Sequence, residues 1–262
     1  MASFATLLNR IRTALRSEPA MANPELADAS GAPAGGEPRS AYKAVWNRLA
    51  ETEEQARFSI GGFTDEAAYV YTGEASMAVL QRTVGIGAED RVLEIGCGVA
   101  RVGFVIAPHC AEWTGCDVSA NMLTHAARRL SSRDNGRLVE ISGFDLAPIA
   151  NASMDVVYCT VVFMHLDEWD RYNYLREAHR VLSPGGRVYV DNFSLATDEG
   201  WSVFEECLKY SPQARPSHIS RSSTPQEISV FLARAGFEAI QIEEDGAWVR
   251  GWARKPAAGS AA

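Results

Sequence analysis

The central and C-terminal parts of the chain alternate between two hydrophobic patterns. Short apolar segments predict strands at 91–95, 112–117, 137–142, 155–162 and 187–193. Between them, apolar residues recur at helical spacing and predict helices at 99–108, 119–131 and 168–182. Alternation of strands and helices is typical of a mainly parallel sheet that is covered by helices on both faces.

The end of the chain follows a different pattern. A helix predicted over 224–235 stops at Gly236, and two strand patterns follow at 237–244 and 247–254. The dipeptide Asp245-Gly246 between these strands is typical of a tight hairpin turn. We therefore expect the otherwise parallel sheet to finish with an antiparallel hairpin.

The first 40 residues differ from the rest in composition. Residues 1–17 carry three arginines and no acidic residue, and their apolar residues recur at helical spacing, which predicts a basic amphipathic helix. Its apolar stripe consists of Phe4, Leu7, Leu8, Ile11 and Leu15. Residues 18–40 are rich in Ala, Pro, Gly and Ser, as in a flexible linker. A globular domain then spans 41–255, with helices predicted over 41–57 and 65–84, before a tail at 256–262.

Three roles of the N-terminal helix stay open. It can make a weak peripheral contact with an anionic membrane, dock on the globular domain or a second subunit, or serve as a targeting peptide. A membrane-binding helix and a targeting peptide are both basic, acid-poor and amphipathic. The residues alone do not distinguish the three roles, and they do not indicate the oligomeric state.

Composition limits the class of protein. With 262 residues, 47% of them hydrophobic, the chain is long enough for one domain with a substantial core. The net charge of −8 disfavours binding to nucleic-acid backbones. No apolar run approaches the ~18 residues of a transmembrane helix. The five cysteines form no CxxC pair and the histidines are scattered, so we expect reduced core thiols, no metal site and a cytoplasmic location.

A glycine-rich turn follows the strand predicted at 91–95. Gly96 and Gly98 let the backbone approach a ligand closely, and such a turn often needs the positive φ that glycine adopts readily. The next strand ends at Asp117, whose carboxylate is placed to accept hydrogen bonds from both hydroxyls of an adenosine ribose. Ser119 is the better N-cap for the following helix, which leaves Asp117 for a ligand.

Two nucleotide cofactors compete for this turn. A dinucleotide usually requires a third glycine near its pyrophosphate, and this chain has Arg101 there, which would crowd the phosphates. S-adenosylmethionine has no phosphate, and it needs an open turn, an acid for the ribose and a polar cap for the adenine. The turn therefore favours S-adenosylmethionine, with a nucleotide-dependent oxidoreductase as the alternative.

Six segments in order resemble the motifs of the class I S-adenosylmethionine-dependent methyltransferases, over roughly residues 70–254. They are Glu94–Gly98, Asp117, Gly143–Leu146, Asp155–Leu166, Leu182–Arg187 and Ala235–Phe237. The resemblance implies a Rossmann-like α/β fold with a doubly wound, mainly parallel seven-stranded sheet in the order 3-2-1-4-5-7-6. In that fold the last strand is antiparallel. In this chain we also expect a helical N-terminal extension before the sheet. Ala100 stands where the family often has a third glycine, and we expect tighter packing there with binding retained.

The resemblance also implies which residues bind the cofactor, S-adenosyl-L-methionine. Val118 and Met122 would lie against the adenine, although Met122 fits ordinary core packing equally well, and Asp145 would bind the exocyclic amine. Residues 71–73 and 159–160 would lie near the methionine part. The full expected set is Glu94, Gly96, Gly98, Asp117, Val118, Met122, Asp145, Leu146, Cys159, Tyr71 and Gly73.

Candidate residues for the methyl acceptor follow the fourth and fifth strands. His165 lies at the end of the sheet where open α/β folds bind ligands, and its ordinary pKa suits a general base; a gating or packed loop histidine is the alternative. His218, a second candidate, lies in the aromatic insertion 194–223, which we interpret either as a lid over the acceptor or as a structural helix with a surface loop. Asp191 and Asn192 are placed to bind the acceptor or the loop backbone.

Together these features predict an enzyme that methylates oxygen or nitrogen of a small molecule, a sugar or a lipid head group, with a protein side chain still open. After the fourth strand the chain lacks the Asn/Asp-Pro-Pro-aromatic signature, which disfavours methylation of adenine or glutamine amino groups. A non-catalytic, methyltransferase-like partner protein is the remaining alternative. The intact Glu94–Gly98 motif, Asp117 and Asp145 argue against it.

Overall fold

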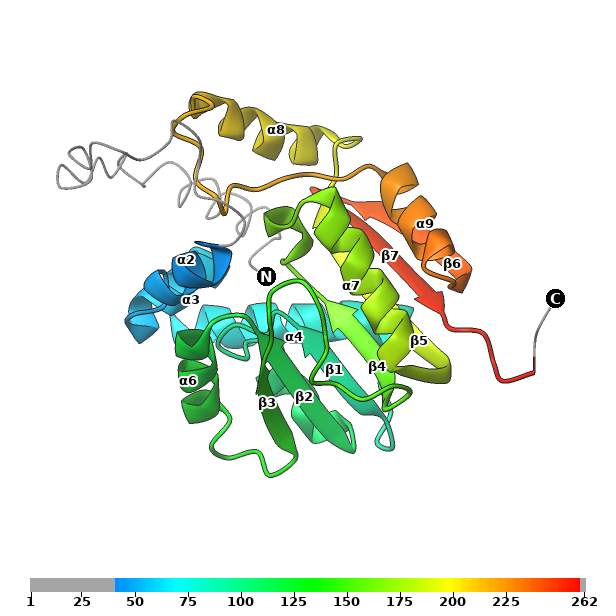
Figure 1. Cartoon of the computed structure of the whole chain (residues 1–262). Coiled ribbons are helices and arrows are strands. Elements are labelled where there is room, and N and C mark those ends of the chain that lie inside the picture. The colour runs from blue at the N-terminus through cyan, green and yellow to red at the C-terminus, as the bar shows by residue number, and fades with distance from the viewer. Residues whose placement is uncertain (1–40, 260–262) are drawn as a thin grey trace.

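The computed structural model describes residues 41–259, which form one seven-stranded sheet flanked by helices (Figure 1). The strands are β1 (Arg91–Ile95), β2 (Glu112–Asp117), β3 (Gly136–Glu140), β4 (Met154–Cys159), β5 (Leu182–Phe193), β6 (Glu238–Asp245) and β7 (Trp248–Arg254). Their order is β3-β2-β1-β4-β5-β7-β6, and β7 runs antiparallel to both of its neighbours. The predicted strand order and the hairpin at Asp245-Gly246 are confirmed. The helix predicted at 1–17, the linker at 18–40 and residues 260–262 lie outside the described part.

The described part contains eight α-helices, three of which precede the first strand. They are α2 (Tyr42–Arg48), α3 (Glu53–Gly61), α4 (Glu66–Thr83), α5 (Gly103–Ile106), α6 (Ala120–Arg129), α7 (Glu168–Val181), α8 (Asp198–Glu206) and α9 (Pro225–Arg234). Short 3-10 turns occur at η3 (Ala107–His109), η4 (Phe163–His165) and η5 (Cys207–Lys209). No helix of residues 41–259 is both long and apolar enough to cross a membrane.

Side chains of the central strands alternate between two apolar cores, one on each face of the sheet. Leu93 of β1 belongs to the core that α7 and α9 cover, together with Val157 and Val188. Its neighbour Val92 belongs to the opposite core, which contains residues of α4 and α5. Burial on both faces explains why these strands are nearly continuous apolar runs.

Several predicted boundaries were wrong. The fifth strand begins at Leu182 and not at 187, and three other differences each have a local reason. The helix expected over 41–57 is interrupted, because Thr52 caps α3 in a reciprocal pair with Gln55: each backbone N–H donates to the other side chain. The helix expected from 99 begins only at Gly103, because the turn before it includes left-handed residues. The fourth strand ends at Cys159 and not at 162, because Val161 has a φ of +61°.

The carboxyl ends of the parallel strands meet at one edge of the sheet, which is where the candidate site lies. Helices α2, α3 and α8 are arranged around this edge in Figure 1. Asn47 of α2 accepts a hydrogen bond from the Ser119 hydroxyl, and its carbonyl accepts one from Asn121, so α2 is fixed to the start of α6. The N-terminal helices therefore form part of the site, although they precede the sheet in the chain.

Candidate functional site

A cavity opens at the carboxyl ends of β1 and β2, in the crevice where open α/β sheets bind ligands. We call it the first cavity. It is lined by the turn after β1, by residues that follow β2 and β3, by the loop 160–166 and by residues of α2 and α3. Seven of the predicted site residues line it: Glu94, Gly96, Gly98, Asp117, Val118, Met122 and His165.

The turn after β1 depends on glycine. Gly96 has a φ of +71° and Gly98 a φ of +52°, which L side chains rarely adopt. A Cβ at Gly96 would lie only 2.4 Å from Cγ2 of Val162, and a Cβ at Gly98 only 2.3 Å from Cδ1 of Ile60. Ala100 also has a positive φ, +57°, and is fully buried, so the position where the family often has glycine is strained here.

Asp117 lies at the tip of β2 and holds the turn in place. One carboxylate oxygen accepts the Gly98 N–H at 2.8 Å, and the other accepts the Ser119 N–H at 2.9 Å. Burial raises the pKa of Asp117 to about 6, against the opposing effect of these two donors. Ser119, as predicted, is the N-cap of α6, since its hydroxyl accepts the Met122 N–H. Each Asp117 oxygen can accept more than one hydrogen bond, so the carboxylate can serve both the turn and a ligand.

Glu94 is the most strongly perturbed carboxyl group of the first cavity. Burial raises its pKa to about 8, although the Tyr158 hydroxyl donates to it at 2.6 Å and the Arg101 charge favours its ionised form. Trp113 in turn donates to the Tyr158 oxygen at 3.1 Å. Arg101 is itself buried and lines the cavity. It is the residue that the sequence predicts to crowd the phosphates of a dinucleotide.

Five residues of the predicted cofactor set do not line the first cavity: Tyr71, Gly73, Asp145, Leu146 and Cys159. Tyr71 is 55% exposed on α4, and a Cβ at Gly73 would meet the Arg101 carbonyl oxygen at 2.9 Å. Leu146 and Cys159 are completely buried in the core beneath α7.

Helices α2 and α3 supply a further wall of the first cavity. Tyr42 and Trp46 of α2 and Ser59 and Ile60 of α3 face the cavity. Sequence reasoning missed these four residues, because contacts between distant segments leave no signal in local periodicity.

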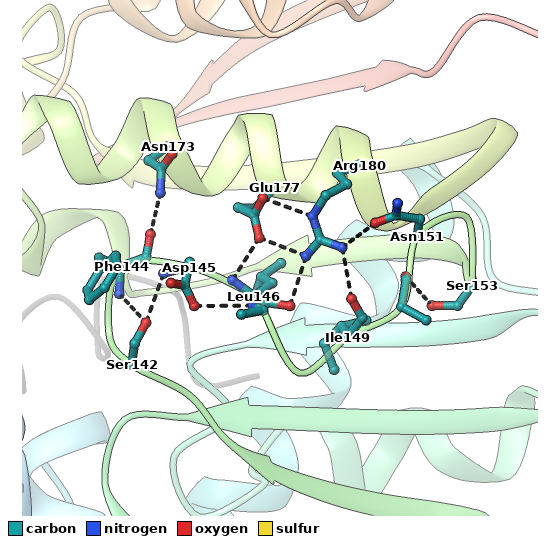
Figure 2. A network of polar contacts seen from close by, with 12 residues as sticks. Ser142, Phe144, Asp145, Leu146, Ile149, Asn151, Ser153, Asn173, Glu177 and Arg180 are labelled. Atoms are coloured by element: carbon teal, nitrogen blue, oxygen red, sulfur yellow. Dashed lines mark hydrogen bonds and ion pairs between the residues drawn. The ribbon is translucent and has the colours of Figure 1, made fainter.

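The segment predicted to cap the adenine, 143–146, is anchored on α7 (Figure 2). Glu177 accepts the Leu146 N–H at 3.0 Å, and Arg180 donates to the Leu146 carbonyl at 2.9 Å. The carboxylate of Asp145 accepts the N–H of Ala147 at 3.1 Å. Gly143 alone of this segment lines the first cavity, so the network fixes the position of the loop rather than presenting Asp145 to the cavity.

A second cavity, of about 170 Å³, adjoins the first. It is lined by residues 58–62, by the loop after β4, by Phe193 and Trp248 at adjoining ends of β5 and β7, and by residues 207–220. The insertion 194–223 therefore contains a helix, α8, and also forms one wall of a cavity. Four residues line both cavities: Ser59, Ile60, Val161 and His165.

His165 stands between the two cavities in a fixed orientation. Its Nδ1 lies 2.8 Å from the carbonyl oxygen of His218, and the Trp46 ring packs edge-on against it at 5.0 Å. Burial lowers the pKa of His165 to about 4, so the expectation of an ordinary histidine pKa was wrong. The main-chain carbonyl of His218, the second base candidate, thus orients the ring of His165, the first candidate.

The two polar residues at the end of β5 bind backbone and side chains rather than either cavity. Asp191 accepts the N–H of Val161, and Asn192 donates to the Ser223 hydroxyl at 2.8 Å. Neither residue lines a cavity. Of the two roles that the sequence left open for them, the structure supports binding to the loops.

Metal ligands do not gather within residues 41–259, where no three His, Cys, Asp or Glu side chains form a group. The five cysteines are free, and four of them are buried. Burial raises the pKa of Cys97 and Cys159 well above that of an ordinary thiol, so these side chains stay protonated.

Comparison with known proteins gives a consistent assignment. Residues 93–190 match the family described as a methyltransferase domain. Methyltransferase GfsG of Streptomyces halstedii is 32% identical over 203 residues, which cover 70% of this chain and 69% of that protein. The 27-O-demethylrifamycin SV methyltransferase of Amycolatopsis mediterranei is 33% identical over 52% of this chain and 50% of its own.

A solved structure supports the fold. Phosphoethanolamine N-methyltransferase 2 of Haemonchus contortus, bound to phosphomonomethylethanolamine and S-adenosylhomocysteine, superimposes with a TM-score of 0.63. It is 17% identical, and the match covers 82% of this chain and 60% of that one. The motif spacing, the strand order and the sequence relatives agree, and they support a methyltransferase over the oxidoreductase and the non-catalytic alternatives. The chain belongs to the class I S-adenosylmethionine-dependent methyltransferases.

Proposed function

We propose that the first cavity binds S-adenosylmethionine, and that the second binds a small-molecule acceptor that is methylated on a hydroxyl oxygen. One observation carries this proposal: His165 lines both cavities, and its ring is held by the His218 carbonyl. A single side chain therefore lies where donor and acceptor would meet.

The first cavity has the chemistry that S-adenosylmethionine requires. Its apolar wall at Val118, Ile141 and Leu166 suits an adenine ring, and the Asp117 carboxylate suits the ribose hydroxyls. The glycine turn brings main chain rather than side chains to the cavity. When bound, the cofactor supplies a methyl group on a positively charged sulfur and leaves as the neutral thioether S-adenosylhomocysteine.

The hydrogen bond to His218 selects the protonation state of His165. A carbonyl oxygen only accepts, so Nδ1 carries the proton and Nε2 keeps its lone pair. The lowered pKa keeps the ring neutral at pH 7, but it also makes the ring a weaker base than an ordinary histidine. In the proposed reaction the acceptor oxygen forms a bond to the methyl carbon, the carbon–sulfur bond breaks with its electron pair left on sulfur, and Nε2 takes the hydroxyl proton.

Positioning supplies most of the catalysis in this proposal. Alignment of two reactants contributes about 7–11 kcal/mol to rate acceleration in favourable cases. Ser59, Ile60 and Val161 line both cavities with His165 and so fix how the two ligands approach each other. The name of the Amycolatopsis relative specifies an O-demethyl substrate, which supports oxygen as the acceptor atom here.

The test compares His165→Gln with His109→Gln, a variant at an exposed histidine after α5. An acceptor is first identified by screening small molecules with methyl-labelled donor. We expect His165→Gln to lower kcat by about 10²–10⁴-fold and to leave the affinity for S-adenosylhomocysteine within a few-fold, while His109→Gln changes neither. Turnover of His165→Gln within a few-fold of the wild type would remove the base from the proposal. Transfer to an amine in the screen would replace oxygen as the acceptor atom.

A further inference from the structure

The described wall of the second cavity carries no ionised side chain. None of the residues between 41 and 259 that line it is Asp, Glu, Lys or Arg. Arg221 lies close by, but it donates to the main-chain carbonyl of His165 and does not line the cavity. Asp191 is behind the loop, bonded to the N–H of Val161.

The walls of this cavity are mainly apolar and partly aromatic. Phe193 and Trp248 stack with ring centroids 4.7 Å apart and belong to a buried cluster that also contains Met164. Phe58 and Ile219 contribute from the two opposite sides, α3 and the insertion. Such walls gain free energy by removing an apolar ligand surface from water.

Several polar groups that line the second cavity form hydrogen bonds within the protein itself. The Ser59 hydroxyl donates to the carbonyls of Leu49 and Gln55, and Cys207 Sγ lies 3.6 Å from the Ser220 carbonyl oxygen. His165 uses Nδ1 on the His218 carbonyl. An ion placed here would lose its hydration without gaining a charged partner from the wall, and that transfer is strongly unfavourable.

The volume limits the part of the acceptor that enters. At about 170 Å³ the cavity is close to the engineered apolar cavity of about 150 Å³ that binds benzene. It therefore holds one six-membered ring or an aliphatic group of similar size. The rest of a larger acceptor has to remain outside.

We propose that the acceptor of this enzyme is uncharged at its reacting end, and that this end is an apolar group about the size of one ring that carries the reacting hydroxyl, seated between residues 58–62 and 207–220. The inference rests on the proposed function, since it names the substrate class of the second cavity. It selects, among the small molecules, sugars and lipid head groups predicted from the sequence, the acceptors with an apolar reacting end. It disfavours phosphorylated, carboxylated and ammonium-bearing ones.

The test measures binding of three phenols that differ mainly in charge. 4-Ethylphenol is neutral, 4-hydroxyphenylacetate is an anion and tyramine is a cation at pH 7. Ligand-observed NMR titrations of the full chain, saturated with S-adenosylhomocysteine, give the three dissociation constants. We expect the neutral phenol to bind roughly tenfold or more tightly than either ion. Equal affinities, or tighter binding of either ion, would overturn the inference.

Charge-switch variants test whether the phenols bind in the second cavity. Ile219→Glu adds a carboxylate to the cavity wall, and Val230→Glu adds one to an exposed position on α9. We expect Ile219→Glu to shift the preference from 4-ethylphenol toward tyramine, and Val230→Glu to leave it unchanged. Phe58→Glu, at the opposite wall, serves as the second variant if Ile219→Glu does not fold. An unchanged preference in the folded cavity variants would also contradict the inference.

These readouts separate the inference from the function on which it rests. They measure binding and need no turnover, so a failure of His165 to act as base leaves them unchanged. If the neutral phenol binds but His165→Gln retains full turnover, the acceptor class stands and the catalytic role falls.

Discussion

The carboxylate of Asp191 accepts the backbone N–H of Val161 at 2.7 Å and holds that residue in a left-handed conformation with a φ of +61°. This conformation is unfavourable for a β-branched side chain by about 1–2 kcal/mol. Val161 lines both cavities, and the adjacent Val162 lies over Gly96. The strain is therefore located in the loop that separates the proposed donor and acceptor sites, and the buried Asp191 offsets it.

This relationship predicts coupling between the two positions. Asp191→Ala leaves a buried N–H without its acceptor and should lower the free energy of unfolding by about 1–3 kcal/mol. In the wild type the loss of Asp191 also lets Val161 leave its strained conformation, which recovers part of that cost; in a Val161→Gly background there is no such strain to recover, so the same change should cost about 1 kcal/mol more. Urea unfolding of the four proteins measures the difference. Additive effects would show that Asp191 does not support the strained residue.

The raised pKa of Glu94 predicts how stability depends on pH. Because its pKa rises from 4.5 to about 8 on folding, the folded protein retains a proton between these pH values that the unfolded chain has lost. Glu94 therefore lowers the free energy of unfolding as the pH rises through this window, by up to about 1.4 kcal/mol per pH unit. The raised pKa of Asp117 and of Asp191 adds a loss of the same sign below about pH 6. The lowered pKa of His165 has the opposite sign and adds stability between about pH 4 and 6.5, so the net decline is clearest above pH 6.5.

Glu94→Gln should flatten the decline of the free energy of unfolding with pH. It should keep the hydrogen bond from Tyr158, because an amide oxygen still accepts. Glu238→Gln, at an exposed position of β6, is the matched control and should leave the slope unchanged. Urea unfolding at pH 5, 6, 7 and 8 measures the slopes. A wild-type protein that gains stability from pH 7 to 8 would contradict the assignment.

The lowered pKa of His165 gives a prediction that needs no acceptor. The ring should titrate near pH 4, and the neutral form should persist through the physiological range. An NMR titration of the histidine ring protons, assigned with His165→Gln, reports the midpoint directly. A midpoint near the ordinary value of 6.5 would mean that the ring is solvated rather than buried between the cavities.

Much of the fold could be predicted because its determinants are local. The apolar runs of the strands, the Asp245-Gly246 turn and the serine cap at Ser119 each depend on neighbouring residues, and all three occur as expected. The interrupted first helix was predictable too, since Thr52 and Gln55 have the spacing of a capping box.

The walls of the two cavities were harder to predict. Tyr42 and Trp46 reach the first cavity only because α2 packs on α6, a contact between segments about 70 residues apart. The depressed pKa of His165 likewise follows from burial by Trp46 and the insertion, which no motif encodes. The family resemblance pointed to the turn and Asp117, which line the first cavity, and also to Tyr71 and Gly73, which do not line it.

Residues 1–17 carry a prediction that the described structure does not address. A basic amphipathic segment would bind anionic lipid weakly, since each arginine near the surface adds only about 1 kcal/mol. If it does, full-length protein should sediment with anionic liposomes at low salt and less at high salt, whereas a chain beginning at Ser40 should stay in the supernatant. Equal recovery of both chains in the supernatant would remove the membrane role and leave docking or targeting.

Calorimetric titration with S-adenosylhomocysteine tests the central claim, that the cofactor binds in the first cavity with its ribose on Asp117. The comparison uses the wild type, Asp117→Ala and Asp145→Ala, whose carboxylate lies outside the cavity lining. We expect Asp117→Ala to lose about 2–4 kcal/mol of binding free energy, because two charge-assisted hydrogen bonds disappear, and Asp145→Ala to bind as the wild type does. An unchanged dissociation constant for folded Asp117→Ala, or a larger loss in Asp145→Ala, would contradict the account.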